Sequence, residues 1–257
     1  MAGQAAARVA LATDVGEGLG PWRIADDEAL LGIVTSANVA CGFHAGDPVI
    51  MRRTCEQAVA NGVAIGAQVS YRDLHGFGRR YVAVPSSELT ADLVYQLGAL
   101  QAFARLAGGG VGYVRAHGAL YNASATDTEH ARAIVDATLG FGPELPVLCQ
   151  AGTEVHRLGE AAGLRMVSEA FVDRGYTAGG LLQPRSEPGA LLTDPDEAAA
   201  RAVRMVTEGR VAAVDGTEVE VRADVLTVHS DTDGAVEIAR ATRAALEDAG
   251  VELVPLR

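Results

Sequence analysis

Lysine is absent from this sequence of 257 residues, in which all 21 basic residues are arginine. The absence excludes a lysine Schiff base, a Ser-Lys catalytic dyad and the lysine of a phosphate-binding P-loop. Any ATP that serves this protein is therefore bound by other means or by a partner protein.

Cysteine and long apolar runs are scarce as well. Cys41, Cys55 and Cys149 lack the CxxC spacing of zinc cages and form no disulfide pattern. No segment approaches the roughly 18 uninterrupted apolar residues of a membrane-spanning helix. Residues 1–12 are too short and too weakly apolar for a secretory signal. We therefore expect a cytoplasmic protein without a membrane partner.

Positive charge is in deficit, because 33 acidic residues outnumber the basic ones and the net charge is -12. Nucleic acids and anionic membranes are bound chiefly by cationic surfaces. We therefore expect a small molecule, and no nucleic acid, as the ligand.

The composition, 49% hydrophobic and 21% charged, is that of a globular protein. Short apolar runs alternate with longer helical patterns, which indicates βα units and a mostly parallel sheet. The expected strands are residues 8–13, 37–40, 64–68, 112–116, 146–150, 165–168, 211–213 and 225–228. The expected helices are residues 48–61, 86–107, 128–139, 153–162, 195–208 and 234–249. No linker divides the chain, so residues 1–257 are predicted to form a single domain.

Polar residues gather where these strands end. In a parallel barrel all the carboxyl ends of the strands meet at one face, where such folds keep their active sites. In an open, doubly wound sheet the same residues would spread along an edge. No GxGxxG motif follows the first strand, which disfavours a dinucleotide-binding Rossmann domain. We predict an α/β fold, an irregular (β/α) TIM-like barrel with about seven or eight parallel strands.

The most informative stretch is residues 36–47, SANVACGFHAGD, where an apolar run ends in Asn38, His44 and Asp47. The flanking glycines suit a site that admits a ligand, and His44 can exchange a proton or bind a cation. Asp47 has a second interpretation as the cap of the helix that follows. Asp14 and Glu17 follow the first strand in the same way and are candidates for a functional or a capping role.

A third cluster, residues 115–122 with the sequence RAHGALYN, follows the fourth strand. His117 is a natural general acid or base, and Tyr121 and Asn122 can hydrogen-bond a carbonyl or carboxylate. A purely structural histidine is the competing interpretation. The local order of His229, Ser230 and Asp231 has little weight as a catalytic triad, because no nucleophile elbow accompanies it.

Arginine-bearing loops complete the set of candidates. Residues 71–80, YRDLHGFGRR, combine arginines with aromatics and glycines as an anion-recognising loop would. Residues 171–192 form a long loop that suits a lid or a partner surface. Arg79, Arg174 and Arg185 are the candidates for binding the substrate, and an exposed soluble loop is the alternative for residues 71–80.

The motifs DVGEGLGPW, SANVACGFHAGDP, LHGFGRR, HGALYN, DRGYT and PRSEPGA, in this order, resemble the LamB/YcsF family over residues 11–253. This resemblance implies a barrel related to polysaccharide-deacetylase-type barrels. It also implies the activity of an ATP-dependent 5-oxoprolinase, as its A component. The reaction opens the lactam of 5-oxo-L-proline to L-glutamate and is performed together with partner subunits B and C.

On that hypothesis the candidates divide into two groups. The catalytic residues are Asp14, His44 or Asp47, which would activate water, and His117, which would carry a proton to the leaving nitrogen. The substrate-binding residues are Glu17, Asn38, Arg79, Tyr121, Asn122, Arg174 and Arg185, with Arg79 or Arg174 holding the substrate carboxylate.

The sequence departs from the family pattern at three places. Residues 12–13, Ala-Thr, replace Asn-Cys; Gln68 replaces a histidine; and Arg115 replaces a lysine. An amide oxygen is a poorer ligand than imidazole for zinc-like ions, so the change at Gln68 leaves a divalent metal uncertain. Two alternatives therefore stand beside the oxoprolinase: a metal-dependent, deacetylase-like hydrolase, and a divergent ligand-binding subunit without catalysis.

Overall fold

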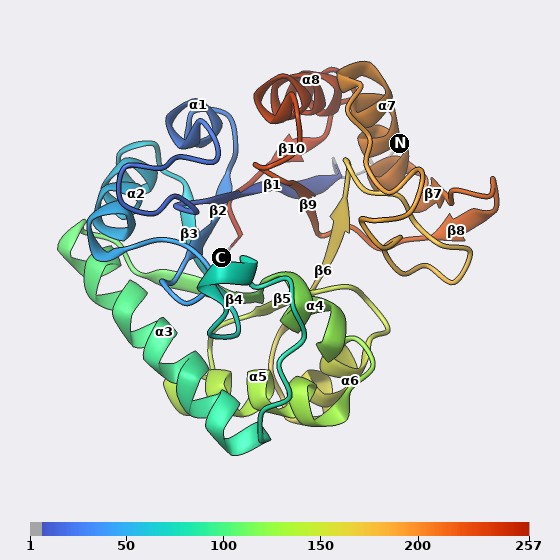
Figure 1. Cartoon of the computed structure of the whole chain (residues 1–257). Coiled ribbons are helices and arrows are strands. Elements are labelled where there is room, and N and C mark those ends of the chain that lie inside the picture. Colours follow the sequence, from blue (N-terminus) through green and yellow to red (C-terminus); the bar gives the residue numbers. More distant parts are fainter. Residues whose placement is uncertain (1–6, 257) are drawn as a thin grey trace, which may run out of the picture.

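Seven parallel strands close into a barrel in the computed structural model, which describes residues 7–256 (Figure 1). The first six strands pair with their neighbours along the chain. β9 then pairs with both β6 and β1 and closes the barrel. The barrel strands are β1 (Arg8–Val15), β2 (Ser36–Ala40), β3 (Ala64–Val69), β4 (Val111–Ala116), β5 (Val147–Cys149), β6 (Met166–Phe171) and β9 (Val225–Val228). The predicted α/β barrel is confirmed, with seven strands.

The barrel is irregular at its amino end, where β1 changes partner. Arg8 and Val9 pair with β10 (Glu252–Leu253), whereas the residues from Ala10 to Thr13 pair with β9. The part of residues 1–12 that precedes position 7, considered above for a secretory signal, lies outside the described residues.

Helices surround the barrel on its outer side (Figure 1). All six expected helices are present, and α1 and α4 were not expected. The helices are α1 (Asp27–Leu31), α2 (Pro48–Ala60), α3 (Ser86–Leu106), α4 (Gly118–Ser124), α5 (Thr128–Phe141), α6 (Glu154–Ala161), α7 (Pro195–Thr207) and α8 (Ala235–Asp248). A short 3-10 helix, η1 (Leu74–Gly76), follows β3. Within the described chain, no helix combines the length and the apolar character that a bilayer-spanning segment requires.

One expected strand, residues 211–213, does not belong to the barrel. It lies in β7 (Arg210–Ala212), which pairs antiparallel with β8 (Glu218–Glu220) in a separate hairpin. Val211 is buried, but the residues on either side of it are exposed. A parallel barrel strand is buried on both faces, so this half-exposed segment was wrongly assigned to the parallel sheet.

The barrel interior changes character from one end to the other. Side chains alternate along a strand, so every second residue points inward. At the amino end these inward residues form an apolar cluster that includes Ala10, Tyr113, Val167 and Val225. Two or four residues further on, the same strands present buried polar groups at the carboxyl end. A larger apolar core lies between the strands and the helices.

Gly66 on β3 gives the Tyr113 ring its place inside the barrel. A Cβ at position 66 would lie 2.1 Å from the ring of Tyr113, and that ring is fully buried. The hydroxyl of Tyr113 donates a hydrogen bond to Asn38 at 2.8 Å, so the ring cannot shift without breaking a buried contact.

We expect Gly66→Ala to lower the free energy of unfolding by about 2–3 kcal/mol, because it overpacks the barrel interior. Gly98→Ala is the matched control, since Gly98 lies within α3 with open space around it. That change should raise stability by about 0.5–1 kcal/mol through helix propensity. Urea denaturation measures both, and a Gly66→Ala protein as stable as the wild type would contradict the packing described here.

Candidate active site

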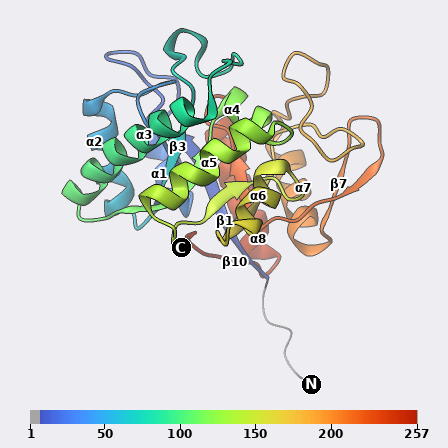
Figure 2. The same cartoon turned by 90° about the horizontal axis from the view of Figure 1, so that it is seen from below.

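A pocket of about 460 Å³ opens at the carboxyl end of the barrel. Figure 2 shows the long loops after β1, β3 and β6 projecting from one end of the molecule. The pocket lining comes from strand ends, from α4 and from the loops after β3 and β6. Its charged or titratable members are Asp14, Arg79, Arg115, His117, Tyr121, Arg174, Arg185 and His229. Its volume is in the range of small-molecule sites, about 300–1,000 Å³.

The floor of the pocket is a buried charge network centred on Arg115. Its Nε donates to both oxygens of Glu169 at 2.9 and 3.1 Å, and its Nη1 donates to Asp14 Oδ1 at 3.1 Å. Asn38 Nδ2 donates to the same oxygen of Asp14 at 2.9 Å. The planar fork of arginine can engage two carboxylates at once, which a lysine ammonium does less readily.

Two aromatic rings cover the guanidinium of Arg115. Its central carbon lies 5.1 Å from the Tyr121 ring centroid and 5.6 Å from that of Phe171, within cation–π range. Burial lowers the pKa of Arg115, but the charges of Asp14 and Glu169 outweigh this effect and raise it above its ordinary value. Arg115 therefore stays charged and is a fixed element of the site.

A histidine–aspartate pair lies at the wall formed by β6 and β9. His229 Nδ1 lies 3.0 Å from Asp173 Oδ1, and the ring stacks on Phe171 with centroids 5.1 Å apart. Asp173 also accepts hydrogen bonds from the His229 backbone N–H and from Thr232. Burial raises the pKa of Asp173, but His229 and these hydrogen bonds outweigh it and hold the pKa below its usual value. The pair orients the ring and leaves Nε2 for the pocket.

Arginines line the rim above this wall. Arg79 and Arg185 both pair with Asp231, the latter through two contacts of 3.2 Å. Arg174 donates to two carbonyls of its own loop, those of Ala190 and Gln183. Burial, then the neighbouring Arg185, lower the pKa of Arg174 to about 10. Arg174 thus shapes the loop, while Arg79 and Arg185 share one carboxylate and carry a net positive charge.

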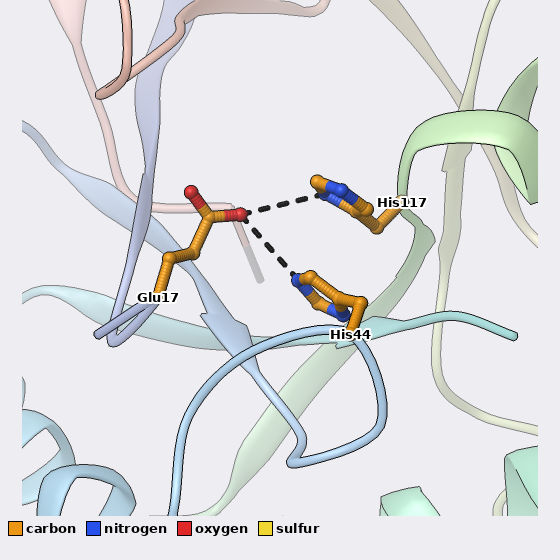
Figure 3. A group of neighbouring side chains, drawn as sticks. All are labelled: Glu17, His44 and His117. Carbon is orange, nitrogen blue, oxygen red and sulfur yellow. Dashed lines mark ion pairs between the residues drawn. The ribbon is translucent and has the colours of Figure 1, made fainter. Parts of the chain in front are cut away.

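Glu17, His44 and His117 form a buried cluster beside the pocket (Figure 3). The Glu17 Oε1 atom lies 3.4 Å from His44 Nε2 and 3.4 Å from His117 Nδ1. The two imidazoles stack almost parallel, with ring centroids 3.9 Å apart. Among residues 7–256, this is the group of acidic, histidine and cysteine side chains whose ligand atoms converge closely enough to hold a metal ion.

The protonation of this cluster follows from its burial. Burial lowers the pKa of His44 to about 3 and holds that of His117 well below its usual value, so both rings are neutral at pH 7. Burial, followed by the charges of Asp14 and Asp231, raises the pKa of Glu17 well above its ordinary value.

The backbone after β3 determines the orientation of the His117 ring. Phe77 has a left-handed conformation, with φ of 54°, and its carbonyl lies 2.9 Å from His117 Nε2. A Cβ at Gly78 would lie 2.8 Å from atoms of both His44 and His117, so only glycine fits there. Because the carbonyl can only accept, His117 Nε2 carries the proton and Nδ1 faces Glu17.

The other candidates from the sequence lie in different surroundings. Asp47 caps α2 through Val49 N and Ile50 N and accepts from Gly20 N, and it does not line the pocket described above. Asn38 lies in the floor network below the pocket. Tyr121 and Asn122 line the pocket from α4. The structure thus brings Asp14, Glu17, His44 and His117 together and gives Asp47 a capping role.

Asp173 and Glu169 are not among the site residues predicted from the sequence, and His229 had little weight there. Each of the three lies in or just after a barrel strand, as the predicted residues do. Their location in or just after a strand was the sequence signal that could have identified them as site residues. The contact between Asp173 and His229 could not be predicted from the sequence, because the two residues are 56 positions apart and meet only where β6 and β9 are neighbours.

Comparisons with known proteins agree with this architecture. The sequence profile of the LamB/YcsF family matches residues 9–257. The A subunit of 5-oxoprolinase from Streptomyces coelicolor is 56% identical over 241 residues, which are 94% of this chain and 96% of that protein. A lactam utilization protein from Thermus thermophilus, whose crystal structure is known, is 48% identical to this chain in sequence. That comparison covers 97% of this chain and 100% of the other, with a TM-score of 0.92.

A more distant likeness concerns the fold alone. The T48 deacetylase is 13% identical, with a TM-score of 0.50, over 98% of this chain and 89% of the other. The predicted likeness of this barrel to a deacetylase barrel is thereby confirmed at the level of the fold. The fold and the site define a (β/α) barrel with a charged pocket at the carboxyl ends of its strands. Within this class the chain belongs to the LamB/YcsF family.

We expect Arg115→Met to lower the free energy of unfolding by about 3–5 kcal/mol, because it leaves the buried Asp14 and Glu169 without their cation. Arg204→Met is the control, since Arg204 pairs with Glu208 and Glu218 on the exposed surface and should have little effect. Chemical denaturation at neutral pH measures both. Equal losses in the two variants would show that the buried network contributes no more than a surface pair.

Proposed function

We propose that this protein is a hydrolase of a cyclic amide, the A component of an ATP-dependent 5-oxoprolinase. Its reaction is the opening of 5-oxo-L-proline to L-glutamate. The observation that carries the proposal is a single pocket in which an oriented histidine faces a cationic rim. The 5-oxoprolinase A subunit from Streptomyces coelicolor and the lactam utilization protein from Thermus thermophilus support the same substrate class.

The rim suits the carboxylate of 5-oxoproline. Arg79 and Arg185 share one partner, Asp231, so one positive charge is left for a substrate anion. Bidentate contact with an arginine fork would place the lactam ring toward the strand ends. Tyr121, whose buried hydroxyl has no hydrogen-bond partner among the described residues, can contact the ring carbonyl.

In this proposal His229 is the residue that transfers the proton. Water adds to the lactam carbonyl carbon, and the ring C–N bond breaks as the nitrogen receives a proton. His229 Nε2 would take the proton from water and return it to nitrogen, while Asp173 stabilises the charged ring. His117 is less suited to that step, because its Nε2–H donates to Phe77 and Gln68 Nε2 lies 3.1 Å from its Nδ1.

ATP use is assigned to the assembly with partner subunits B and C. The chain has no lysine and no P-loop to hold a triphosphate. Phosphorylation of the lactam oxygen by the partners would make the carbonyl carbon a better electrophile for water. ADP leaves in that phosphorylation step. Water addition and C–N cleavage would then leave the phosphoryl group on the new carboxyl group as an acyl phosphate, and a second water would release it as inorganic phosphate to give glutamate.

Glutamate formation from 5-oxoproline and ATP tests the proposal, assayed with this chain alone and with subunits B and C. We expect glutamate only in the complete mixture. No turnover in the complete mixture, beside an active mixture in which a homologous A component replaces this chain, would favour the alternative of a ligand-binding subunit without catalysis. Release of acetate from acetylated sugars, with no glutamate formed, would favour the deacetylase alternative.

We expect His229→Gln to lower kcat in that mixture by about 10²–10⁴-fold with little change in KM, because it removes proton transfer and leaves the rim intact. His156→Gln is the matched control, since His156 lies on α6 and pairs with the exposed Glu160. A His229→Gln enzyme with near-normal kcat would remove His229 from the mechanism.

A further inference from the structure

We propose that Glu17, His44 and His117 bind a divalent transition-metal ion, with Gln68 as the fourth side chain of the site. The inference rests on the geometry of these side chains and does not depend on the identity of the substrate. Each comes from the end of a different barrel strand, and all four are buried.

Two of the three distances between ligand atoms are those of a tetrahedral metal site, and all three ligand atoms lie within 4.8 Å of one another. A tetrahedral zinc ion with bonds of about 2.0–2.1 Å holds its ligand atoms about 3.3–3.4 Å apart. Glu17 Oε1 lies 3.4 Å from His44 Nε2 and 3.4 Å from His117 Nδ1. A charged hydrogen bond between the same groups would be shorter, about 2.7–2.9 Å.

The cluster also leaves buried polar atoms without partners. Glu17 Oε1 and both ring nitrogens of His44 form no hydrogen bond with any described residue. An unsatisfied buried polar atom costs about 1–3 kcal/mol, and more when it is charged. One cation would satisfy Glu17 Oε1 and His44 Nε2 together, and Figure 3 shows the carboxylate pointing between the two rings.

The outer contacts already orient His117 as a ligand. Metal-bound histidines commonly donate their second N–H to a carbonyl or carboxylate, which fixes the tautomer and leaves the other nitrogen free to ligate. His117 Nε2 contacts the Phe77 carbonyl at 2.9 Å, so its Nδ1 lone pair faces Glu17. The left-handed conformation of Phe77 and the close approach of Gly78 hold this carbonyl in place.

Gln68 completes the site from β3. Its Nε2 lies 3.1 Å from His117 Nδ1, and its Oε1 has no hydrogen-bond partner among the described residues. A half-turn of the amide would bring the oxygen to the position of the nitrogen, where it faces the ligand atoms. Two imidazoles, one carboxylate and an amide oxygen favour Zn²⁺ or a neighbouring first-row ion over Mg²⁺ or Ca²⁺.

Zinc binding to the purified full chain, stripped with a chelator and titrated with ZnCl₂ in a calorimeter, tests the site without any substrate. We expect one Zn²⁺ per chain. His44→Gln and Glu17→Gln should each weaken binding by more than about 100-fold, because even outer-shell changes cost about 10–100-fold. His75→Gln, at an exposed histidine of η1, is the control and should bind like the wild type. No binding by the wild type, or equal binding by His44→Gln, would overturn the proposal.

A second measurement retains all three proposed ligands, so it holds even if the ligand variants fail to fold. Co²⁺ bound to the wild type should show visible d–d absorption, and Gln68→His should shift these bands and tighten binding by adding an imidazole. A wild type without such bands would overturn the metal site. Bands that Gln68→His leaves unchanged would overturn the place of Gln68 in it.

Discussion

One buried arginine constrains the whole carboxyl end of the barrel. Arg115 on β4 reaches across the interior to Asp14 on β1 and to Glu169 on β6, strands that are not its neighbours. Two carboxylates at this depth are tolerable only with a charged partner, and removing it would leave both in a low-dielectric interior. The arginine fork therefore fixes the distance between opposite walls.

The candidate functional residues come a few positions after the residues of this network in the sequence. Glu17 comes three residues after Asp14, His117 two after Arg115, and Asp173 four after Glu169. The loops that carry them begin from strand ends held by the network, so the Glu17–His44–His117 cluster and the Asp173–His229 pair have defined positions at one pocket. The glycines at 66 and 78 allow the close packing that this arrangement needs.

The barrel class could be predicted because both of the sequence patterns that indicate it are local. Apolar runs of strand length alternate with helical patterns, and polar residues follow the runs, so the strands, the outer helices and the active end could be read from the chain. The strand predicted at residues 211–213 failed for a reason that is not local. A short apolar run is compatible with a barrel strand or a hairpin, and only the packing around Val211 distinguishes them.

The sequence by itself determined the family, the barrel and the end that bears the chemistry, and His44, His117, Asp14 and Glu17 were among its candidates. It could not assign Asp47, whose position before Pro48 fits a cap or a catalytic acid equally well. Tertiary structure shows that Asp47 caps α2, and it decided three further questions: the pairing of Asp173 with His229, the convergence of Glu17 on two stacked imidazoles, and the binding of Arg174 to its own loop. Each depends on side chains that are far apart in the chain or on a loop conformation, and barrel closure brings the distant ones within bonding distance.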